Sequence, residues 1–404
     1  MARATVAPRI LGEATTVVNQ GDLVTRYRGV FADATAVVQA RSPGRINLIG
    51  EHVDYNDGFV LPIAMAQALY VLAGPSEDGQ IAVHSTAFDQ TVSFSADDPG
   101  PAGAPAWANY VRGVAALLVK QGIRLTGGRL FIHSEVPVGG GVSSSAALEV
   151  GTALALLALA GARMEPVSLA LLARQAEHEY ANSPCGIMDQ FICVLGRAEH
   201  ALLLDCRSRE YQQIPLPLHD TAIVVMNTQV KHSIGASQYP VRQRQCREGL
   251  ASLQSAYPQL GSLRDATEAM LEAQRDRLGA VVFRRCRHVV TEIARTRQAA
   301  DVLRRGDLQT LGRLMYASHA SLRDDYAVSC PELDHLVATA QGVDGVWGAR
   351  MTGGGFGGCA IALVQRQAVD ALRNAIAREY DTRFEKPAMV YTTSATDGAS
   401  TQTI

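Results

Sequence analysis

The sequence predicts an α+β protein built from two domains. Segments with the apolar alternation of strands and segments with the apolar spacing of helices follow one another along 404 residues, which is enough chain for about two or three domains. The composition is that of a globular protein, with 47% hydrophobic and 19% charged residues. A formal net charge of -2, from 37 basic and 39 acidic side chains, excludes a polycationic nucleic-acid binder, an acidic buffer protein and a disordered tail.

The first half of the chain mixes short strands with longer helices. Short apolar segments predict strands at residues 45–49, 69–73, 81–85 and 129–134. A stretch rich in proline, glycine and alanine predicts a surface loop at residues 97–105. Apolar residues repeat with helical spacing, and so predict helices, at residues 106–121, 143–161 and 167–180.

The second half is expected to form its own domain, because Pro215 and Pro217 interrupt both kinds of pattern. We therefore divide the chain into domains at residues 1–216 and 217–404. In the second domain, strands are predicted at residues 221–227, 346–351, 359–364 and 388–393. Helices are predicted at residues 239–256, 280–305, 308–324 and 367–380, and a further segment at 331–341 precedes the second of these strands.

The cysteines and the N-terminal sequence predict a cytoplasmic protein. Seven cysteines, an odd number without a C-x-x-C pair, are expected to be reduced thiols of the core: Cys185, Cys193, Cys206, Cys246, Cys286, Cys330 and Cys359. The first residues contain no continuous apolar block ahead of a small-residue cleavage site. No segment approaches the ~20 apolar residues that a membrane span needs, so we expect no membrane partner.

A dense polar cluster follows the first predicted strand. After Arg45 and Asn47 the chain turns and reaches Glu51, His52 and Asp54, with apolar segments on both sides of the cluster. An exposed turn with ordinary surface charges is the simpler reading, but the apolar flanks favour a buried position. A metal site of the histidine and the two carboxylates is disfavoured, because neighbours on an extended chain point to opposite faces. Carboxylates beside a histidine and an amide suit a polyhydroxylated ligand, because each carboxylate accepts two hydroxyl hydrogens.

A loop of three glycines and three serines precedes the most helical segment of the first domain. Glycines let backbone N–H groups approach a phosphate, and the first turn of a helix adds free donors and the positive end of its dipole. The pattern is neither a P-loop nor a dinucleotide-binding fingerprint, because no lysine follows and Ser144 replaces the last glycine. Alternatively, the serines cap the helix and the glycines make a tight turn; with three serines, one hydroxyl can cap while another reaches phosphate or Mg²⁺.

A lone carboxylate, Asp189, stands among the apolar residues 187–192. A buried aspartate is costly unless it is paired, so it either caps a helix or pairs with an arginine, or it faces a reacting hydroxyl. In the second case Glu177, twelve positions earlier on the preceding helix, is a candidate metal ligand. A further glycine cluster at residues 351–358 precedes an apolar strand and could close over a nucleotide.

Together these motifs resemble those of the galactokinases, in the GHMP family of sugar and metabolite kinases. The family's G-R-x-N-L-I-G-E-H-x-D-Y stretch matches residues 44–55, its glycine and serine loop matches 139–145, its G-I-M-D-Q-F matches 186–191 and its third glycine motif matches 353–358. Segments at 239–242 and 329–334 are also similar to family segments. The resemblance spans nearly the whole chain, and the first motif is specific to galactokinases.

The resemblance implies the two-domain GHMP kinase fold. Its N-terminal domain is like domain 2 of ribosomal protein S5, its C-terminal domain is ferredoxin-like, and the active site lies in the cleft between them. It also implies that the chain transfers the γ-phosphoryl group of ATP to the C1 hydroxyl of D-galactose. We expect a monomer whose partners are D-galactose and ATP, without nucleic acid.

The resemblance also implies a role for each site residue. Asp189 would face the anomeric hydroxyl, with Arg45 beside it, and whether Asp189 removes the proton or only orients the hydroxyl stays open. The sugar's other positions would be held by Glu51, His52, Asp54, Gly186 and Tyr239. The ATP phosphates would be wrapped by Gly139, Gly140, Gly141, Val142, Ser143, Ser144 and Ser145. Mg²⁺ would be held by Ser145 and Glu177.

Two other functions are compatible with the same motifs. Some relatives of galactokinases bind galactose and ATP without catalysis and act as sensors, but the complete serine loop and the presence of Asp189 favour an enzyme. A kinase for a related sugar, such as N-acetylgalactosamine, arabinose or galacturonate, is the second alternative. Glu51 argues against an acid sugar, because two carboxylates would repel each other.

Overall fold

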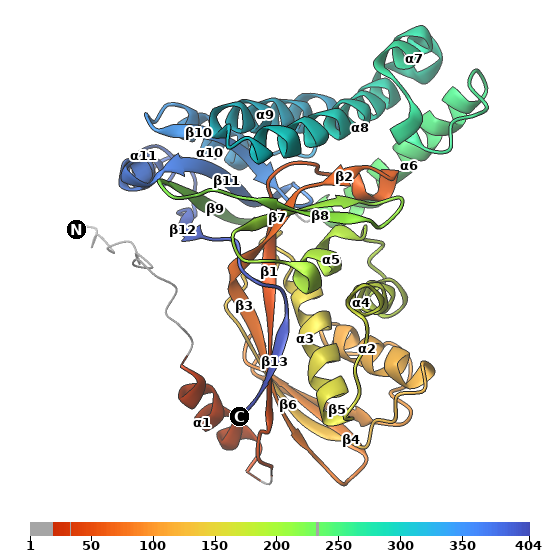
Figure 1. Cartoon of the computed structure of the whole chain (residues 1–404), viewed down its shortest axis with the longest axis vertical. Coiled ribbons are helices and arrows are strands. Elements are labelled where there is room, and N and C mark those ends of the chain that lie inside the picture. The colour runs from red at the N-terminus through yellow and green to blue at the C-terminus, as the bar shows by residue number, and fades with distance from the viewer. Residues whose placement is uncertain (1–18, 33, 232–233) are drawn as a thin grey trace.

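The structure is a computed structural model that describes residues 19–32, 34–231 and 234–404, and it consists of two domains (Figure 1). The first domain is built on a six-stranded sheet in the order β13-β1-β3-β6-β4-β5. Neighbouring strands are antiparallel, except that β4 and β6 are parallel. The strands are β1 (Val38–Asn47), β3 (Pro62–Pro75), β4 (Gln80–Ser85), β5 (Gln90–Ser95), β6 (Gly128–Ser134) and β13 (Ser400–Thr403).

Helices cover both faces of this sheet. In β3, Leu72 packs in a cluster with residues of α1, whereas its neighbours Val71 and Ala73 pack in a larger cluster with α2, α3 and α4. This division follows from the alternation of side chains along a strand. The helices are α1 (Gln20–Val30), α2 (Ala108–Lys120), α3 (Ser144–Leu159), α4 (Pro166–Tyr180) and α5 (Met188–Leu195).

The second domain contains a four-stranded antiparallel sheet in the order β10-β11-β9-β12. Numbered within this domain, the order is 2-3-1-4, which is the arrangement of a ferredoxin-like fold. The helices α10 and α11 pack against the sheet, and the expected fold is confirmed. These elements are β9 (Thr221–Lys231), β10 (Val346–Thr352), β11 (Gly357–Gln365), β12 (Met389–Thr393), α10 (Pro331–Gln341) and α11 (Val369–Glu379).

A shared apolar core joins the two domains. Ile46, Leu48 and Ile49 from the first domain cluster with Ile223 and Val225 of β9, and all five side chains are buried. Because burial of apolar surface favours this docking, the polar residues that follow Ile49 are held at the domain junction. A small sheet of β2 (Phe59–Val60), β7 (His200–Asp205) and β8 (Tyr211–Pro215) lies at the same junction.

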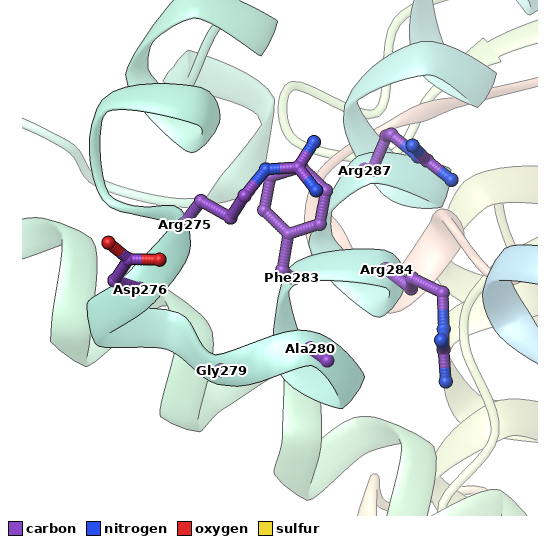
Figure 2. A pocket seen from close by; sticks show the side chains of 7 residues that line it. All are labelled: Arg275, Asp276, Gly279, Ala280, Phe283, Arg284 and Arg287. Carbon is purple, nitrogen blue, oxygen red and sulfur yellow. The ribbon is translucent and has the colours of Figure 1, made fainter.

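Four further helices complete the second domain: α6 (Ile234–Gln254), α7 (Glu268–Ala273), α8 (Arg275–Arg304) and α9 (Leu308–Ser321). Near its start α8 bends at Gly279, whose φ of 70° and ψ of 157° are not helical. At this bend the Phe283 ring lies beneath Arg275, 4.2 Å from its guanidinium carbon (Figure 2). None of the site residues expected from the sequence lines the hollow at this bend.

Several predicted boundaries are wrong. The strand expected at 45–49 is part of β1, which begins earlier and ends at Asn47. Leu48 and Ile49 are buried but lie in a loop, so their apolar character did not mark a strand. The helix expected from Tyr239 begins at Ile234, since Pro240, which usually marks a helix start, lies inside the helix. The helix expected to reach residue 324 ends at Ser321 and continues as a π-helical turn.

The expectation for the cysteines agrees with the structure. All seven cysteines are free thiols, and each except Cys185 is buried. No helix in the described part of the chain is long and apolar enough to cross a membrane. The first sheet contains residues from both ends of the chain, and the domain boundary after residue 216 stays a prediction.

Candidate active site

A polar cavity of about 280 Å³ lies where the two domains meet. It is lined from the first domain by the end of β1 and the loop after it, by the glycine and serine loop, and by α4 and α5. The second domain contributes Tyr239 of α6 and the glycine turn between β10 and β11. Every site residue expected from the sequence lines this cavity except Gly140 and Val142. Four motifs that are distant along the chain therefore form one site.

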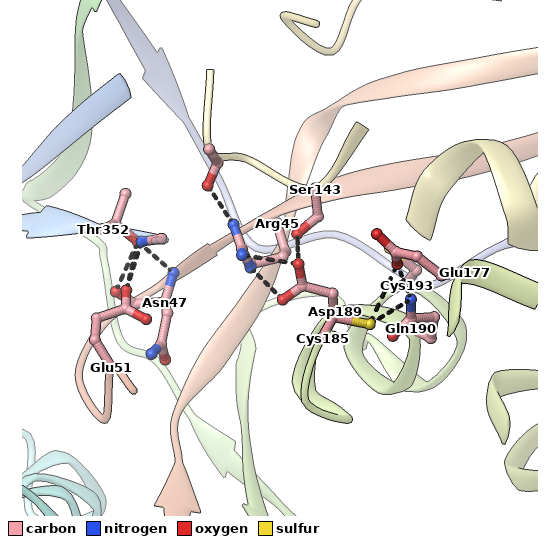
Figure 3. Close-up of polar contacts among 12 residues, drawn as sticks. Arg45, Asn47, Glu51, Ser143, Glu177, Cys185, Asp189, Gln190, Cys193 and Thr352 are labelled. Carbon is pink, nitrogen blue, oxygen red and sulfur yellow. Dashed lines mark hydrogen bonds and ion pairs between the residues drawn. The ribbon is translucent and has the colours of Figure 1, made fainter. Parts of the chain in front are cut away.

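Arg45 and Asp189 form a bidentate ion pair in this cavity (Figure 3). The Arg45 Nε donates to Asp189 Oδ1 and Nη2 donates to Oδ2, both at 2.9 Å. The third guanidinium nitrogen donates to the carbonyl of Gly141 at 2.6 Å. The Ser143 hydroxyl also donates to Asp189 Oδ2. Asp189 is thus held between the strand of the polar cluster and the glycine loop.

The position of Arg45 follows from an irregularity of β1. The pairing of β1 with β3 shifts between Pro43 and Arg45, and the intervening Gly44 lies so close to the loop that a Cβ would be 2.9 Å from the Val142 carbonyl. The backbone N–H of Arg45 donates to that carbonyl at 3.1 Å. Burial lowers the pKa of Arg45, but the nearby carboxylates, Asp189 first, raise it more, so the net shift is upward.

The glycine loop bends tightly before α3. Gly139, Gly141 and Ser143 all have positive φ, at 70°, 73° and 62°. Ser143 occupies the N-cap position of α3, but its hydroxyl makes no capping bond and reaches Asp189 instead. The capping alternative is therefore wrong for this serine. Because α3 begins at Ser144, directly after the glycines, the free N–H groups that the first turn of any helix has are next to this loop, as anion binding at a helix start requires.

Glu177 of α4 lines the same cavity and is almost fully buried. The Gln190 amide donates to its Oε2 at 2.7 Å, and the hydroxyl of Ser183 and the thiol of Cys185 donate at 3.3 Å each. Burial, followed by the charge of Asp189, raises the pKa of Glu177, whereas the neighbouring donors oppose that rise. A buried carboxylate with these neighbours gains from a cation that neutralises its charge.

Asp54 and Gly186 form another part of the cavity wall. Burial raises the pKa of Asp54 to about 7, and the charges of Asp189 and Glu51 add to the rise. Gly186 lies against this carboxylate so closely that a Cβ at residue 186 would overlap its atoms. Tyr239 packs edge to face on Tyr55, with ring centroids 5.3 Å apart. Glycine at 186 thus keeps the carboxylate accessible from the cavity.

His52 is a neutral imidazole in this site. Its Nε2 lies 3.2 Å from the carbonyl of Gly354, and its Nδ1 lies 2.8 Å from the hydroxyl of Tyr55. A carbonyl only accepts, so Nε2 carries the proton and Nδ1 accepts from the tyrosine. Burial lowers the pKa of His52 to about 3. Both ring nitrogens therefore have partners within the protein. The ring also packs against that of Tyr326, with centroids 4.9 Å apart.

Glu51 connects the cavity to the second domain. Its Oε1 accepts from the backbone N–H of Gly353 at 2.8 Å and from the Thr352 hydroxyl at 3.1 Å, and it pairs with Arg350 at 3.4 Å. Its carboxylate, predicted to hold the sugar, therefore also anchors the glycine turn that follows β10. Gly353 itself approaches the Gly141 carbonyl, so this turn packs on the glycine loop of the first domain.

Sequence reasoning missed three residues that line the cavity, namely Ser183, Cys185 and Met188. Cys185 directly precedes the G-I-M-D-Q-F motif and Met188 is part of it, so membership of that segment was an available signal. Ser183 has no comparable signal, because an isolated serine in a loop is common on protein surfaces.

A second, apolar cavity of about 300 Å³ adjoins the first. The two cavities share Gly139, Ser144 and Ser145. The rings of Phe88 and Trp107 are stacked at its side, with centroids 5.6 Å apart and an interplanar angle of 9°. Its other walls include Leu69, Tyr110, Ile132, Val138 and Leu148. An aromatic, apolar cavity at the end of a phosphate-type loop fits a planar nucleobase.

Comparison with protein families defines the class. The galactokinase galactose-binding signature matches residues 25–75, the GHMP kinase N-terminal domain matches 109–197 and the GHMP kinase C-terminal domain matches 299–382. The fold and the site are thus those of a phosphotransferase of the GHMP kinase class.

Similarity to individual proteins then gives the family. The chain is 43% identical to a galactokinase of Roseiflexus sp. (strain RS-1), over 95% of this chain and 97% of the relative. It is 45% identical to the galactokinase of Homo sapiens, over 94% of this chain and 96% of the relative. The chain belongs to the galactokinase family, and it is therefore an ATP-using sugar kinase.

Solved structures agree with this membership. A galactokinase of Lactococcus lactis, crystallised in complex with galactose, matches with a TM-score of 0.90 and 37% identity, covering 94% of this chain and 99% of that chain. A mevalonate kinase of Methanococcus jannaschii matches with a TM-score of 0.63 and 16% identity, covering 90% of this chain and 99% of that chain. The second match shows a common fold alone.

Proposed function

We propose that this chain transfers the γ-phosphoryl group of ATP to the C1 hydroxyl of D-galactose, giving galactose 1-phosphate, with Asp189 and Arg45 at the reacting centre. The observation that supports this assignment is the bidentate pair of Arg45 and Asp189 between a polar cavity and a glycine loop. The carboxylate would accept the hydrogen of the attacking hydroxyl. The guanidinium would stabilise the charge of the transferred phosphoryl group.

Asp189 would act mainly by orienting the hydroxyl. It already accepts two hydrogen bonds from Arg45 and one from Ser143, which fix the position of its carboxylate in the cavity. In a loose phosphoryl-transfer transition state the nucleophile needs little activation, so positioning supplies most of the benefit. The proton would pass to Asp189 late, as the new bond to phosphorus forms.

The nucleotide would lie across the two adjoining cavities. The loop at residues 139–145 and the first turn of α3 offer backbone donors to the phosphates. The apolar cavity beside the stacked rings of Phe88 and Trp107 would take the adenine base.

Mg²⁺ is part of the proposal. It needs hard oxygen ligands and usually binds one or two carboxylates together with substrate phosphates and water. The carboxylate of Glu177 and the hydroxyl of Ser145 line the same cavity, and their donor types fit the ion. Held by Glu177 and Ser145, the ion would neutralise negative charge on the phosphates. Seven unpaired thiols also favour the cytoplasm as the compartment, because such thiols stay reduced there.

For the sugar we propose Glu51, His52, Asp54, Gly186 and Tyr239 as the binding residues, with His52 contributing its ring as part of the wall, since both its nitrogens have partners within the protein. Asp54 offers the best acceptor, because glycine at 186 leaves its carboxylate open to the cavity. Glu51 would offer its second oxygen, since Oε1 is used by the second domain. The two carboxylates favour a neutral sugar over galacturonate.

The proposed function is tested by steady-state release of ADP with a panel of sugars at fixed ATP and Mg²⁺. We expect turnover with D-galactose and little or none with galacturonate. Better turnover with N-acetylgalactosamine or arabinose than with D-galactose would identify that sugar as the substrate instead. Tight binding of galactose and ATP without ADP release would instead make the protein a sensor.

A further inference from the structure

Glu149 is a buried carboxyl group to which the proposed reaction assigns no role. It lies on α3, one turn after Ser145, and is fully shielded from solvent. Among the described residues its polar contact is with Gln190, whose Nε2 donates to Glu149 Oε2 at 3.0 Å. Its Oε1 is buried and has no hydrogen-bond partner there. A carboxyl group in such a place costs stability unless its position serves something else.

Gln190 links Glu149 to Glu177. The same Nε2 that donates to Glu149 also donates to Glu177 Oε2 at 2.7 Å, so the two hydrogens of one amide nitrogen serve two carboxyl groups. Gln190 is itself fully buried and follows Asp189 in α5. Figure 3 shows its amide pointing at Glu177, beside the thiol of Cys185.

We propose that Glu149 is a positioning residue of the metal site, which fixes the amide of Gln190 and through it the orientation of the Glu177 carboxylate. The inference rests on the proposed role of Glu177 as a Mg²⁺ ligand. Groups that hold a metal-binding side chain by a hydrogen bond orient it, and losing one typically lowers metal affinity by about 10–100-fold. Without Glu149, one N–H of Gln190 would lose its carboxyl acceptor, and the amide would turn toward a weaker one, such as the Cys185 sulfur 3.8 Å from the same nitrogen.

The protonation of Glu149 supports this role. Burial raises its pKa well above the ordinary value, and the charge of Glu177 raises it further. A neutral acid adds no second negative charge next to the proposed metal ligand. Glutamine has the same shape and is also neutral, so Glu149→Gln is the matched control for Glu149→Met, which removes the acceptor.

The test is a titration of the full-length protein with Mn²⁺ in the presence of saturating ADP, with free Mn²⁺ followed by electron paramagnetic resonance. We expect Glu149→Met to weaken Mn²⁺ binding about tenfold or more and Glu149→Gln to keep it within about twofold. The dissociation constant for galactose should be unchanged in both variants. Equal Mn²⁺ affinity of Glu149→Met and the parent, or an equal loss in both variants, overturns the proposal.

Two further variants keep the test decisive. If Glu149→Met does not fold, Glu149→Asp keeps the acid but is one methylene too short to reach Gln190, and unchanged Mn²⁺ affinity in that variant overturns the proposal. Glu177→Ala is measured alongside. If Glu177→Ala binds Mn²⁺ normally, the metal-ligand assignment itself fails. If it binds weakly while Glu149→Met binds normally, only the positioning role fails.

Discussion

The raised pKa of Asp54 predicts that galactose binds more weakly in acid. Burial and two neighbouring carboxylates put the pKa of this group at about 7 in the protein without sugar. Sugar hydroxyls donate to a carboxylate, so the ionised form is the one that binds well. Protonation therefore competes with the sugar as the pH falls through about 7.

The size of the effect follows from the fraction ionised. With a pKa of about 7, about 90% of Asp54 is ionised at pH 8 and about 10% at pH 6, and apparent affinity scales with that fraction. The dissociation constant for galactose should thus rise about tenfold from pH 8 to pH 6, or about 1.4 kcal/mol. Isothermal titration calorimetry measures this dissociation constant, and nucleotide is left out so that the protonation of ATP does not contribute.

Asp54→Asn is the control for this prediction. The variant keeps the side-chain shape but does not titrate, so it should bind galactose more weakly at pH 8 and show no change between pH 8 and pH 6. A dissociation constant of the parent protein that is constant over this range would refute the assignment, as would an equal slope in the variant.

The raised pKa of Asp54 also makes the free energy of unfolding depend on pH. Asp54 has an ordinary pKa of 3.8 when unfolded and about 7 when folded, so the folded state holds its proton more tightly. The contribution of Asp54 to stability is therefore present below about pH 4 and is lost as the pH rises to about 7. The unfolding temperature of the parent protein, relative to that of Asp54→Asn, should therefore fall as the pH rises from about 4 to about 7.

Three more predictions concern the reacting centre. Asp189→Asn should keep galactose affinity but lose turnover by orders of magnitude, because the charge that orients the hydroxyl is removed; near-normal ADP release would remove Asp189 from the mechanism. Glu177→Ala should need more Mg²⁺ for half-maximal rate, because a ligand is lost, and an unchanged Mg²⁺ dependence would contradict that role. Gly186→Ala should raise the KM for galactose strongly at an unchanged KM for ATP, because the new Cβ overlaps the Asp54 carboxylate; equal KM values for both proteins would show that the carboxylate is free to move.

The sequence predicted well those features that are local along the chain. Each of three features combines a short apolar element with a turn: the polar cluster, the glycine loop and the segment around Asp189. Such combinations involve residues that are neighbours in the chain, so the sequence pattern predicts them. The pairing of Asp189 with an arginine was one of the readings of its buried carboxylate, and the structure has that pair. Family resemblance supplied the partner, because no rule of spacing links Arg45 to a residue so distant in the chain.

The features that the sequence did not predict depend on contacts between segments that are distant in the chain. The Ser143 hydroxyl was expected to cap α3 or reach phosphate, and it contacts Asp189 because α5 packs against the start of α3. The use of Glu51 Oε1 by Thr352 and Gly353 depends on how the two domains dock. The strand β13 was not predicted, because a short polar segment such as Ser400–Thr403 has no apolar alternation.

The position of β13 links the order of synthesis to the order of folding. Its residues pair with the outer edge of β1, with Val38 opposite Thr403, so the first sheet gains a strand from residues that are translated after the strands of the second domain. A ribosome releases residues from the N-terminus onward, and the edge of β1 therefore stays open until the whole second domain has emerged. An open strand edge is a template for unwanted pairing with other chains. During translation this hazard lasts until residues 400–403 have emerged, and it falls on the strand that also presents the arginine of the reacting centre.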